Sequence, residues 1–538
     1  MQFQQLTKLP TNARVGVVGG GISGLFFTYF LGKLRPDVHI TLMDPNHGRP
    51  GGWINSWQTN DKSGKDIMIE RGPRTLRGVS DGTVLMIDAL EQHGQADKIK
   101  CIEKTAKANK KFLLDPNSHL IQVPDSWNSL GKFYSNPISK GLATSILFEW
   151  ARAKKIGEED ESVAQLIKRR FGKSNLGDNI MSAIYNGIYA DDIATLSAKK
   201  VSANLFKDEQ NYGSTLKAAL AKWWKQIGSK DFNSPKLSPV LQKYKENFGK
   251  NGDGILKLSK KLKEYPMLSF SGGLSVVPNT IATALKSMPN VLIMDEKVTK
   301  LGLKNNKLQL ELSSKNVVTS KDFDHVRFSL TPNYIQNIIT KDINPSLNDK
   351  LQKIKYNTVL LVNFYLPGKD VITEKYHSFG YLIPNSNPNP EKLLGVIFDS
   401  VIEQSAKALF STSTNSTSAV KQTYTKLTAM VGGHLLNDAA GNTLIPDEKT
   451  AISQVKNALR KHLNIATEDL DAGLWVYTVA KDCLPRFSVG YQDLAESIEE
   501  EVIKDYNGQV SFGGMAFARG PGVPDVVTDS MLDAIKLK

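Results

Sequence analysis

The chain has 538 residues, a formal net charge of +14 and an apolar fraction of 40%, and this length can hold two or three domains with a sizeable core. Two cysteines, Cys101 and Cys483, exclude a disulfide framework and a cysteine-based metal cluster, and the eight histidines lack ligand spacing. No metal site is therefore expected. Since no apolar run of about eighteen residues occurs, no transmembrane helix is expected either. The basic balance suits an acidic ligand or an anionic membrane face, whereas the basic–aromatic repeats typical of nucleic-acid binding are missing.

A glycine-rich turn follows the first predicted strand. The β-branched run at 15–18 predicts a strand buried on both faces, and an apolar helix is expected at 25–31. Gly19, Gly21 and Gly24 have the G-x-G-x-x-G spacing, which permits a tight turn, approach of a pyrophosphate and close helix–strand packing. The helix N-terminus would offer free N–H groups to the phosphates. The predicted dinucleotide contacts are Gly19, Gly20, Gly21, Ile22, Ser23 and Gly24.

The next strand, 38–43, ends in Asp44, about twenty residues after the last glycine, where an acid binds ribose hydroxyls. A double-glycine turn follows directly, and such a turn has no place in an ordinary nicotinamide domain. FAD is therefore the expected dinucleotide. Further predicted contacts are Asp44, Arg49, Gly52 and Trp53.

A polar hairpin loop at 59–65 and a return strand at 66–70 lead to a Gly-Pro turn with irregular backbone. We expect this turn to lie beside the cofactor, with Arg74 near its phosphates or its ring, although a plain loop is the alternative. The contacts expected here are Gly72, Pro73, Arg74 and Thr75.

A helix at 81–90 and a hairpin spanning 110–124 come next, and strand-end solvation is one explanation of Lys110 and Lys111. The segment 127–206 then turns helical, with aromatic and basic residues interspersed. Leu142, Ile146 and Trp150 are spaced by four, so they share a helical face. That pattern suits an interfacial helix on a bilayer, and an ordinary helical insert explains much of it as well.

The second half of the chain is rich in strands. After a polar surface excursion at 228–250, a helix is expected through 276–285, followed by a strand at 291–294 and a meander from 297 to 330. Strands at 358–365, 380–384, 394–399 and 425–433 predict a mostly antiparallel sheet that forms a second domain. The Ser/Thr-rich stretch 404–418 is expected to be a loop.

The chain closes with a strand at 509–515, a glycine turn at 520–525 and a helix at 526–535. The N-terminus of this helix could stabilise negative charge on the N1–C2=O edge of a reduced flavin. A helix that only packs is the alternative.

Five motifs in one order carry a family resemblance: Arg49-Pro-Gly-Gly-Trp53, Gly72-Pro-Arg74, Phe379-Gly-Tyr-Leu-Ile-Pro384, Leu394-Gly-Val-Ile-Phe-Asp-Ser400 and Lys481-Asp-Cys-Leu-Pro-Arg486. Over nearly the whole chain, the sequence resembles the protoporphyrinogen oxidases of the flavin amine-oxidase superfamily, and the fungal mitochondrial members in particular.

The resemblance implies a mixed α/β (α+β) fold, in which a Rossmann-like FAD-binding domain is interleaved with an antiparallel-sheet substrate domain and a helical membrane-binding insert. The expected FAD-binding parts are 1–86, 265–318 and 481–538; the insert is 87–206; the substrate parts are 207–264 and 319–480.

The resemblance also implies the activity: oxidation of protoporphyrinogen IX to protoporphyrin IX by dioxygen in haem synthesis, with one noncovalent FAD, hydrogen peroxide as by-product and no obligatory acid–base side chain. Carried over for FAD are the backbone of Val298 and the closing turn Gly522, Val523, Pro524 and Asp525; for the macrocycle, Leu382 and Phe398. The implied location is the intermembrane-space side of the mitochondrial inner membrane, as a peripheral protein. A homodimer and contact with the neighbouring haem-pathway enzyme stay open. The N-terminus lacks a secretory signal, so an organelle address would be internal.

Two departures from the family pattern occur. Asp44 stands where Glu is common, and Lys111 stands where many members have an Arg that holds a propionate. Lysine keeps the charge but loses the bidentate fork, so Lys111 is expected to anchor the propionate more weakly. The alternatives are another flavin amine oxidase or desaturase, and a flavin-free escort-type binding protein with this fold.

Overall fold

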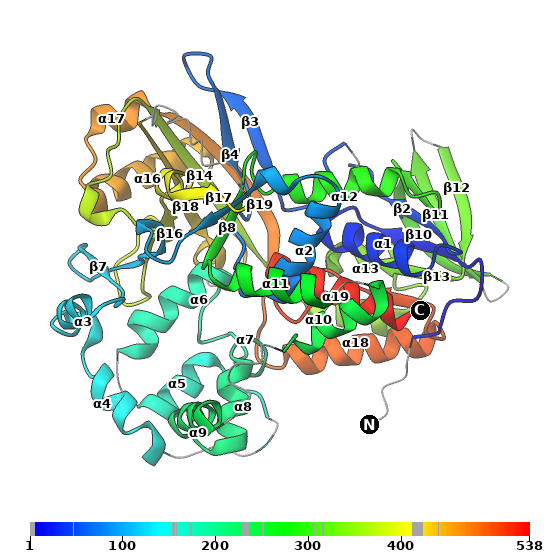
Figure 1. Cartoon of the computed structure of the whole chain (residues 1–538), viewed down its shortest axis with the longest axis horizontal. Coiled ribbons are helices and arrows are strands. Elements are labelled where there is room, and N and C mark those ends of the chain that lie inside the picture. Colours follow the sequence, from blue (N-terminus) through cyan, green and yellow to red (C-terminus); the bar gives the residue numbers. More distant parts are fainter. Residues whose placement is uncertain are drawn as a thin grey trace.

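The computed structural model describes residues 6–46, 48–152, 157, 159–172, 175–228, 236–249, 252–304, 307–314, 317–410, 423–438 and 441–538. A five-stranded parallel sheet has the order β20-β13-β1-β2-β9 (Figure 1). Its strands are β1 (Arg14–Val18), β2 (His39–Met43), β9 (Val291–Met294), β13 (His325–Phe328) and β20 (Val510–Phe512). The sheet thus unites the start, middle and end of the chain.

Both faces of this sheet are covered, which is why its first strand is a continuous apolar run. One face carries the helices α1 (Ile22–Leu34), α2 (Asp81–Gln92), α12 (Val276–Lys286) and α19 (Val523–Lys536). The other face packs against the antiparallel meander β10 (Lys297–Lys304), β11 (Lys307–Ser314) and β12 (Val317–Phe323) and against α13 (Pro332–Ile338), α14 (Pro345–Lys353) and α18 (Tyr491–Asp505). The predicted Rossmann-like unit is confirmed.

A second, seven-stranded sheet has the order β19-β14-β18-β16-β15-β6-β7 and is antiparallel except for the pair β15–β6. Its strands are β6 (Phe112–Leu114), β7 (Leu120–Gln122), β14 (Tyr356–Pro367), β15 (Gly380–Leu382), β16 (Leu393–Ile397), β18 (Tyr424–Gly432) and β19 (Leu474–Pro485). Helices α16 (Glu448–Leu463) and α17 (Thr467–Ala472) pack on one face in a single apolar core. The predicted second domain is therefore present.

Helices form a separate lobe below the seven-stranded sheet in Figure 1. They are α3 (Trp127–Tyr134), α4 (Leu142–Leu147), α5 (Val163–Phe171), α6 (Ser182–Tyr189), α7 (Ala198–Val201), α8 (Ala203–Tyr212) and α9 (Thr215–Gly228), with the short turns η3 (Pro137–Ser139), η4 (Glu149–Ala151) and η5 (Leu176–Met181).

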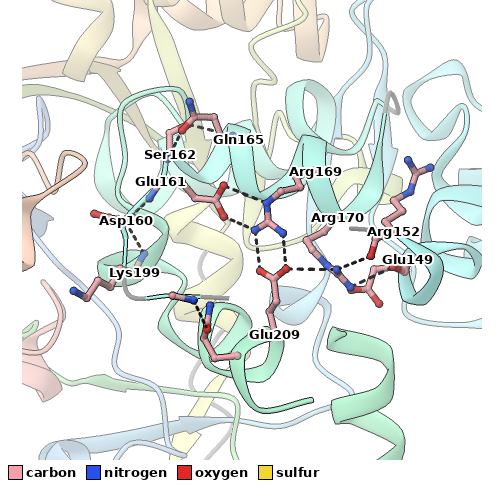
Figure 2. A network of polar contacts seen from close by, with 12 residues as sticks. Glu149, Arg152, Asp160, Glu161, Ser162, Gln165, Arg169, Arg170, Lys199 and Glu209 are labelled. Carbon is pink, nitrogen blue, oxygen red and sulfur yellow. Dashed lines mark hydrogen bonds and ion pairs between the residues drawn. The ribbon is translucent and has the colours of Figure 1, made fainter. Parts of the chain in front are cut away.

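A buried chain of ion pairs holds this lobe together (Figure 2). Arg170 pairs with Glu149, and both side chains are completely buried. Arg169 pairs with Glu161 and Glu209, and Glu209 also lies 3.5 Å from Arg170. The Glu149 carboxylate further accepts hydrogen bonds from the Ser214 hydroxyl and the Thr215 backbone amide, at 2.6 and 3.0 Å. These contacts tie α5 to η4, α8 and the start of α9.

The remaining elements join the two sheets. A hairpin of β3 (Ser56–Asn60) and β4 (Asp66–Glu70) projects from the molecule in Figure 1, and β17 (Ala406–Ala408), β5 (Ile99–Ile102) and β8 (Met267–Phe270) form a small sheet. Also present are α10 (Pro239–Phe248), α11 (Gly252–Lys263), α15 (Asp399–Ser405) and the short turns η1 (Ala96–Lys98), η2 (Lys107–Asn109), η7 (Glu374–Tyr376) and η8 (Gly433–Leu436).

The sheets divide the chain differently from the predicted boundaries. Strand β13 pairs with β1, so the nucleotide-binding unit continues past residue 318. Helices α10 and α11 bury Leu241, Tyr244 and Leu262 beside α1 and α2, so 236–249 and 252–263 pack on the nucleotide-binding unit rather than on the second sheet. Strands β6 and β7, placed in the insert, complete the second sheet. Apolar contacts far along the sequence determine these memberships, and local patterns do not reveal them. The predicted loop 404–418 is only partly a loop, because α15 runs to Ser405 and Ala406–Ala408 form β17. Its residues 411–418 and residues 229–235 and 250 of the predicted excursion lie outside the described residues.

Candidate cofactor and substrate site

The first glycine loop connects β1 to α1 and leaves no room for side chains at two positions. Gly19 has φ +107°, and its amide donates to the Met43 carbonyl at 2.9 Å. A Cβ atom at Gly24 would lie 1.9 Å from the Gly19 carbonyl oxygen, so the helix can approach the turn only with glycine there. These are the tight-turn and close-packing roles expected of this motif.

The middle of the loop is an open backbone cradle. A Cβ atom at Gly21 would meet only the Gly52 Cα within 4 Å, at 3.9 Å. Gly21 caps α1 without a side-chain hydrogen bond. The second glycine turn lies alongside, because the Gly51 amide donates to the Gly20 carbonyl at 3.0 Å and Gly51 and Gly52 both have positive φ. The backbone of the two glycine turns, without side chains, and the N-terminus of α1 are suited to binding a phosphate group.

Asp44 lies at the rim of the cradle. Its carboxylate accepts the Gly20 amide at 2.5 Å and the Asn46 amide at 2.8 Å. A carboxylate has about four lone-pair sites, so it can still accept both hydroxyls of a ribose. The Asp44 amide donates to the Met294 carbonyl at 3.1 Å. This contact brings the end of β9 to the same rim. The predicted residue Val298 lies at the start of the neighbouring strand β10 and is buried in the core between the parallel sheet and the meander.

The closing segment reaches the same place. Helix α19 packs along α1, and the Ser530 hydroxyl donates to the Ser23 carbonyl at 3.2 Å across 507 positions. Gly522 caps α19 without a side-chain hydrogen bond, so the turn of Gly522, Val523, Pro524 and Asp525 presents a second helix N-terminus. Burial, together with nearby Asp529, raises the pKa of Asp525.

The third predicted turn lies against the second. A Cβ atom at Gly72 would lie 2.1 Å from the Trp53 carbonyl oxygen. The Arg74 side chain, expected near the phosphates or the ring, instead pairs with Asp399 of α15 and donates to the Thr428 hydroxyl at 2.8 Å. Its charge is therefore engaged between the two sheets.

Two acidic residues near this turn were missed from the sequence. Besides Asp399, Glu70 is buried: its carboxylate accepts the Leu274 amide and the Ser56 hydroxyl, both at 2.8 Å. Burial raises the pKa of Glu70. Alternation along β4 puts Glu70 on the face of Asp66 and Met68, opposite the buried Ile67 and Ile69, so the strand pattern did not indicate a buried carboxylate. Nothing local indicated the partner of Arg74 either.

The three predicted macrocycle residues come from adjacent strands but lie on different faces. Leu113 pairs with Leu382, and Leu382 packs with it against the helical lobe. Lys111 is exposed and precedes β6 by one residue. Phe398, in contrast, is 0% exposed and packs with Tyr381 in the core on the other face, with ring centroids 6.0 Å apart. Leu382 therefore lies on the face toward the helical lobe, and Phe398 packs in the core on the opposite face.

These residues fit a dinucleotide. The open cradle at Gly21 would bind the pyrophosphate, and Asp44 would bind the adenosine ribose. The turns at 52–53, 72–75 and 522–525 would contact the rest of the dinucleotide. The fit depends on bare backbone at Gly21 and Gly52, where any side chain would occupy the phosphate position.

Comparisons with known proteins give the same assignment. A family model described as flavin containing amine oxidoreductase matches residues 46–508. The chain is 46% identical over 537 residues to a protoporphyrinogen oxidase of Saccharomyces cerevisiae, covering 99% of both chains. To a protoporphyrinogen oxidase of Schizosaccharomyces pombe it is 28% identical over 529 residues, covering 97% of this chain and 98% of the relative. The chain belongs to the flavin-containing amine oxidoreductases, in their protoporphyrinogen oxidase family.

This family membership makes the chain an oxidoreductase with a flavin cofactor. The fold agrees: a crystal structure described as that of a candidate protoporphyrinogen oxidase from Exiguobacterium sp. 255-15 superposes with a TM-score of 0.68 at 18% identity, covering 98% of this chain and 99% of that one.

Proposed function

We propose that this chain oxidises protoporphyrinogen IX to protoporphyrin IX in haem synthesis, using one noncovalent FAD and dioxygen. The observation that carries the proposal is the open backbone cradle that both glycine turns and Asp44 form at the start of α1, in a chain that matches a protoporphyrinogen oxidase over its full length. Overall, six hydrogens leave the substrate and three dioxygen molecules become three hydrogen peroxide molecules.

A bound flavin supplies the hydride acceptor for this chemistry, and the chain's own residues bind, orient and shield. The N-terminus of α19 would stabilise negative charge on the cofactor through its free backbone amides. Leu382 would offer an apolar contact to the macrocycle, and Lys111 would offer a cation to one propionate. Lys111→Ala should weaken substrate binding by about 1–3 kcal/mol, the range for a charged hydrogen bond, and an unchanged KM would remove Lys111 from the site.

Anaerobic mixing with protoporphyrinogen tests the proposal directly. Flavin absorbance near its visible maximum should bleach, and air should restore it while porphyrin fluorescence appears. Acid precipitation should release the flavin into the supernatant as FAD, because no covalent bond is proposed. A colourless protein that stays colourless with added FAD would overturn the assignment.

We further propose that the helical lobe attaches the protein peripherally to a membrane, in line with the location expected from the family resemblance. Among the residues described, no helix has both the length and the apolar character needed to cross a bilayer. The lobe instead exposes large apolar side chains: Trp127 is 89% exposed, and six others are more than half exposed, namely Leu147, Phe148, Trp150, Leu220, Trp223 and Trp224. Such aromatic and aliphatic groups beside exposed Lys132, Lys140 and Lys217 suit an anionic interface.

The predicted interfacial stretch 127–150 therefore gains a second element. Helix α9 packs beside η4, the turn that holds Trp150, and α9 itself exposes Trp223 and Trp224. Flotation with anionic liposomes should fall when Trp150, Trp223 and Trp224 are replaced by serine. The same three-serine replacement at the exposed residues Val317, Val318 and Leu303, on the distant meander, is the control.

A further inference from the structure

One arginine beside the second glycine turn has no acidic partner. Arg71 follows β4 directly, and its guanidinium lies over the Trp57 indole, with the central carbon 4.0 Å from the ring centroid. Its Nε atom is buried and makes no hydrogen bond to any described residue. Within the described part of the chain, no carboxylate forms an ion pair with Arg71 or with Arg49. A buried donor without an acceptor is costly, so this arrangement is expected where a ligand supplies the acceptor.

A run of backbone contacts links Arg71 to the two glycine turns. Its amide donates to the Asn55 carbonyl at 2.8 Å, and the next residue, Gly72, lies so close to the Trp53 carbonyl that only glycine fits. Gly51 lies two residues before Trp53, and its amide donates a hydrogen bond to the Gly20 carbonyl of the first glycine loop. A short run of backbone contacts thus connects Arg71 to the proposed phosphate position.

Arg49 lies near enough to act on Arg71. Burial lowers the pKa of Arg71, and the positive charge of Arg49 lowers it further. Two arginines that share a region without a carboxylate between them repel each other unless an anion lies close by. Stacking on Trp57 restrains the orientation of the planar Arg71 guanidinium, and this favours bidentate contact with phosphate oxygens.

The proposed cofactor supplies such an anion. A pyrophosphate diester is a dianion, whereas the N-terminus of α1 provides only about half a unit of positive charge. Side-chain cations would supply the rest. From this geometry we infer that Arg71, together with Arg49, binds the pyrophosphate of the dinucleotide, which makes Arg71 a cofactor-binding residue that the glycine motifs do not indicate. The inference rests on the proposed FAD cofactor.

Titration of the flavin-depleted full-length protein tests this role. FAD binding is followed by flavin fluorescence, and ADP, which carries the pyrophosphate without a flavin ring, is measured as a competitor. Arg71→Met should raise the dissociation constants of both FAD and ADP by about tenfold or more, as expected for the loss of a charged hydrogen bond. The salt dependence of the FAD dissociation constant should become shallower. Arg71→Lys should lose less, because it keeps the charge but not the fork.

Two control variants separate the possible failures. Lys62→Met removes a positive charge at the far end of the same hairpin and should leave both affinities unchanged. Gly21→Ala should abolish FAD binding if the cofactor proposal holds. Unchanged FAD and ADP affinity in Arg71→Met, alongside loss in Gly21→Ala, overturns the role of Arg71 alone. A raised KM for protoporphyrinogen with unchanged FAD affinity also overturns it, since the anion would then be a substrate carboxylate. Unchanged FAD binding in Gly21→Ala overturns the cofactor site itself.

Discussion

Arg74, in the turn after β4, forms an ion pair with Asp399, the first residue of α15 and 325 positions away in the chain. Both side chains are only 8% exposed. Thr428 of β18 completes the group, accepting a hydrogen bond from Arg74 at 2.8 Å and donating one to Asp399 at 2.6 Å. The pair therefore fastens the turn that lies beside the cradle to the seven-stranded sheet.

Removing one member of this pair should be costly. Arg74→Met or Asp399→Leu leaves a buried charge without its partner, and each should lower the free energy of unfolding by about 3–5 kcal/mol. The double variant should lose less than the sum of the two, which urea unfolding of all four proteins measures. The exposed pair Lys341–Asp349, with side chains 60% and 56% exposed, is the control. Lys341→Met should cost less than about 1 kcal/mol. Additive losses at Arg74 and Asp399 would contradict the coupling.

Two glycines of the first loop should respond differently to alanine. At Gly21 the backbone is extended (φ −67°, ψ 173°) and a Cβ atom has space, so Gly21→Ala should fold normally and lose bound flavin. At Gly24 the Cβ atom would lie 1.9 Å from a carbonyl oxygen, so Gly24→Ala should lose both stability and flavin. The melting temperature and the flavin-to-protein ratio separate these outcomes.

Gly48→Ala is the matched control for both variants, because nothing lies within 4 Å of its Cβ position near the second glycine turn. It should retain flavin and melting temperature. Flavin retention in Gly21→Ala would show that no phosphate occupies the cradle.

Buried histidines should make the protein sensitive to acid. Burial lowers the pKa of His325 to about 3 and that of His462 to about 4, whereas an unfolded chain has a value of about 6.5. Between these values the unfolded chain binds a proton that the folded chain does not, so stability falls as the pH drops below about 6.5. At pH 5 each histidine should cost about 2 kcal/mol relative to pH 7.5.

Unfolding measured by urea at pH 7.5 and pH 5 checks this. His462, whose Nδ1 lies 3.0 Å from the Tyr381 hydroxyl, can be replaced by glutamine, and the variant should lose less stability on acidification than the parent. Equal slopes for the parent and His462→Gln would rule out this residue as a source.

The nucleotide-binding unit could be predicted from the sequence because its signals are local. The glycine spacing, the apolar strand 15–18 and the acid at position 44 each report on their own few residues, and the structure places them as expected. The predicted strands at 66–70 and 291–294 were also correct for this reason.

Membership of a sheet could not be predicted in the same way. The twelve-residue strand β19 pairs with β14, which lies more than a hundred positions earlier in the chain. The local sequence of Leu474–Pro485 does not indicate that this strand is its partner. The partner of Arg74 could not be predicted for the same reason. The local sequence of the turn is compatible with a charge near the cofactor, and it contains no information about Asp399, which lies opposite in the structure. Phe398 was expected in the pocket from the family resemblance. The face on which a residue near a strand end lies depends on the register and on the bend that follows, which the motif alone does not give.

Phe398 should therefore act on stability rather than on substrate binding. Its side chain is 0% exposed in the core beneath the seven-stranded sheet, and its amide donates to the Phe379 carbonyl at 2.9 Å. Phe398→Ala should lower the free energy of unfolding by about 3–5 kcal/mol through the cavity it leaves. Phe398→Leu should cost less, because it keeps most of the volume. Leu382→Ala, on the opposite face beside the helical lobe, should raise KM for protoporphyrinogen more than it lowers the melting temperature. Steady-state kinetics and thermal melts on the three variants decide between the two faces, and a raised KM in Phe398→Leu with an unchanged melting temperature would return Phe398 to the pocket.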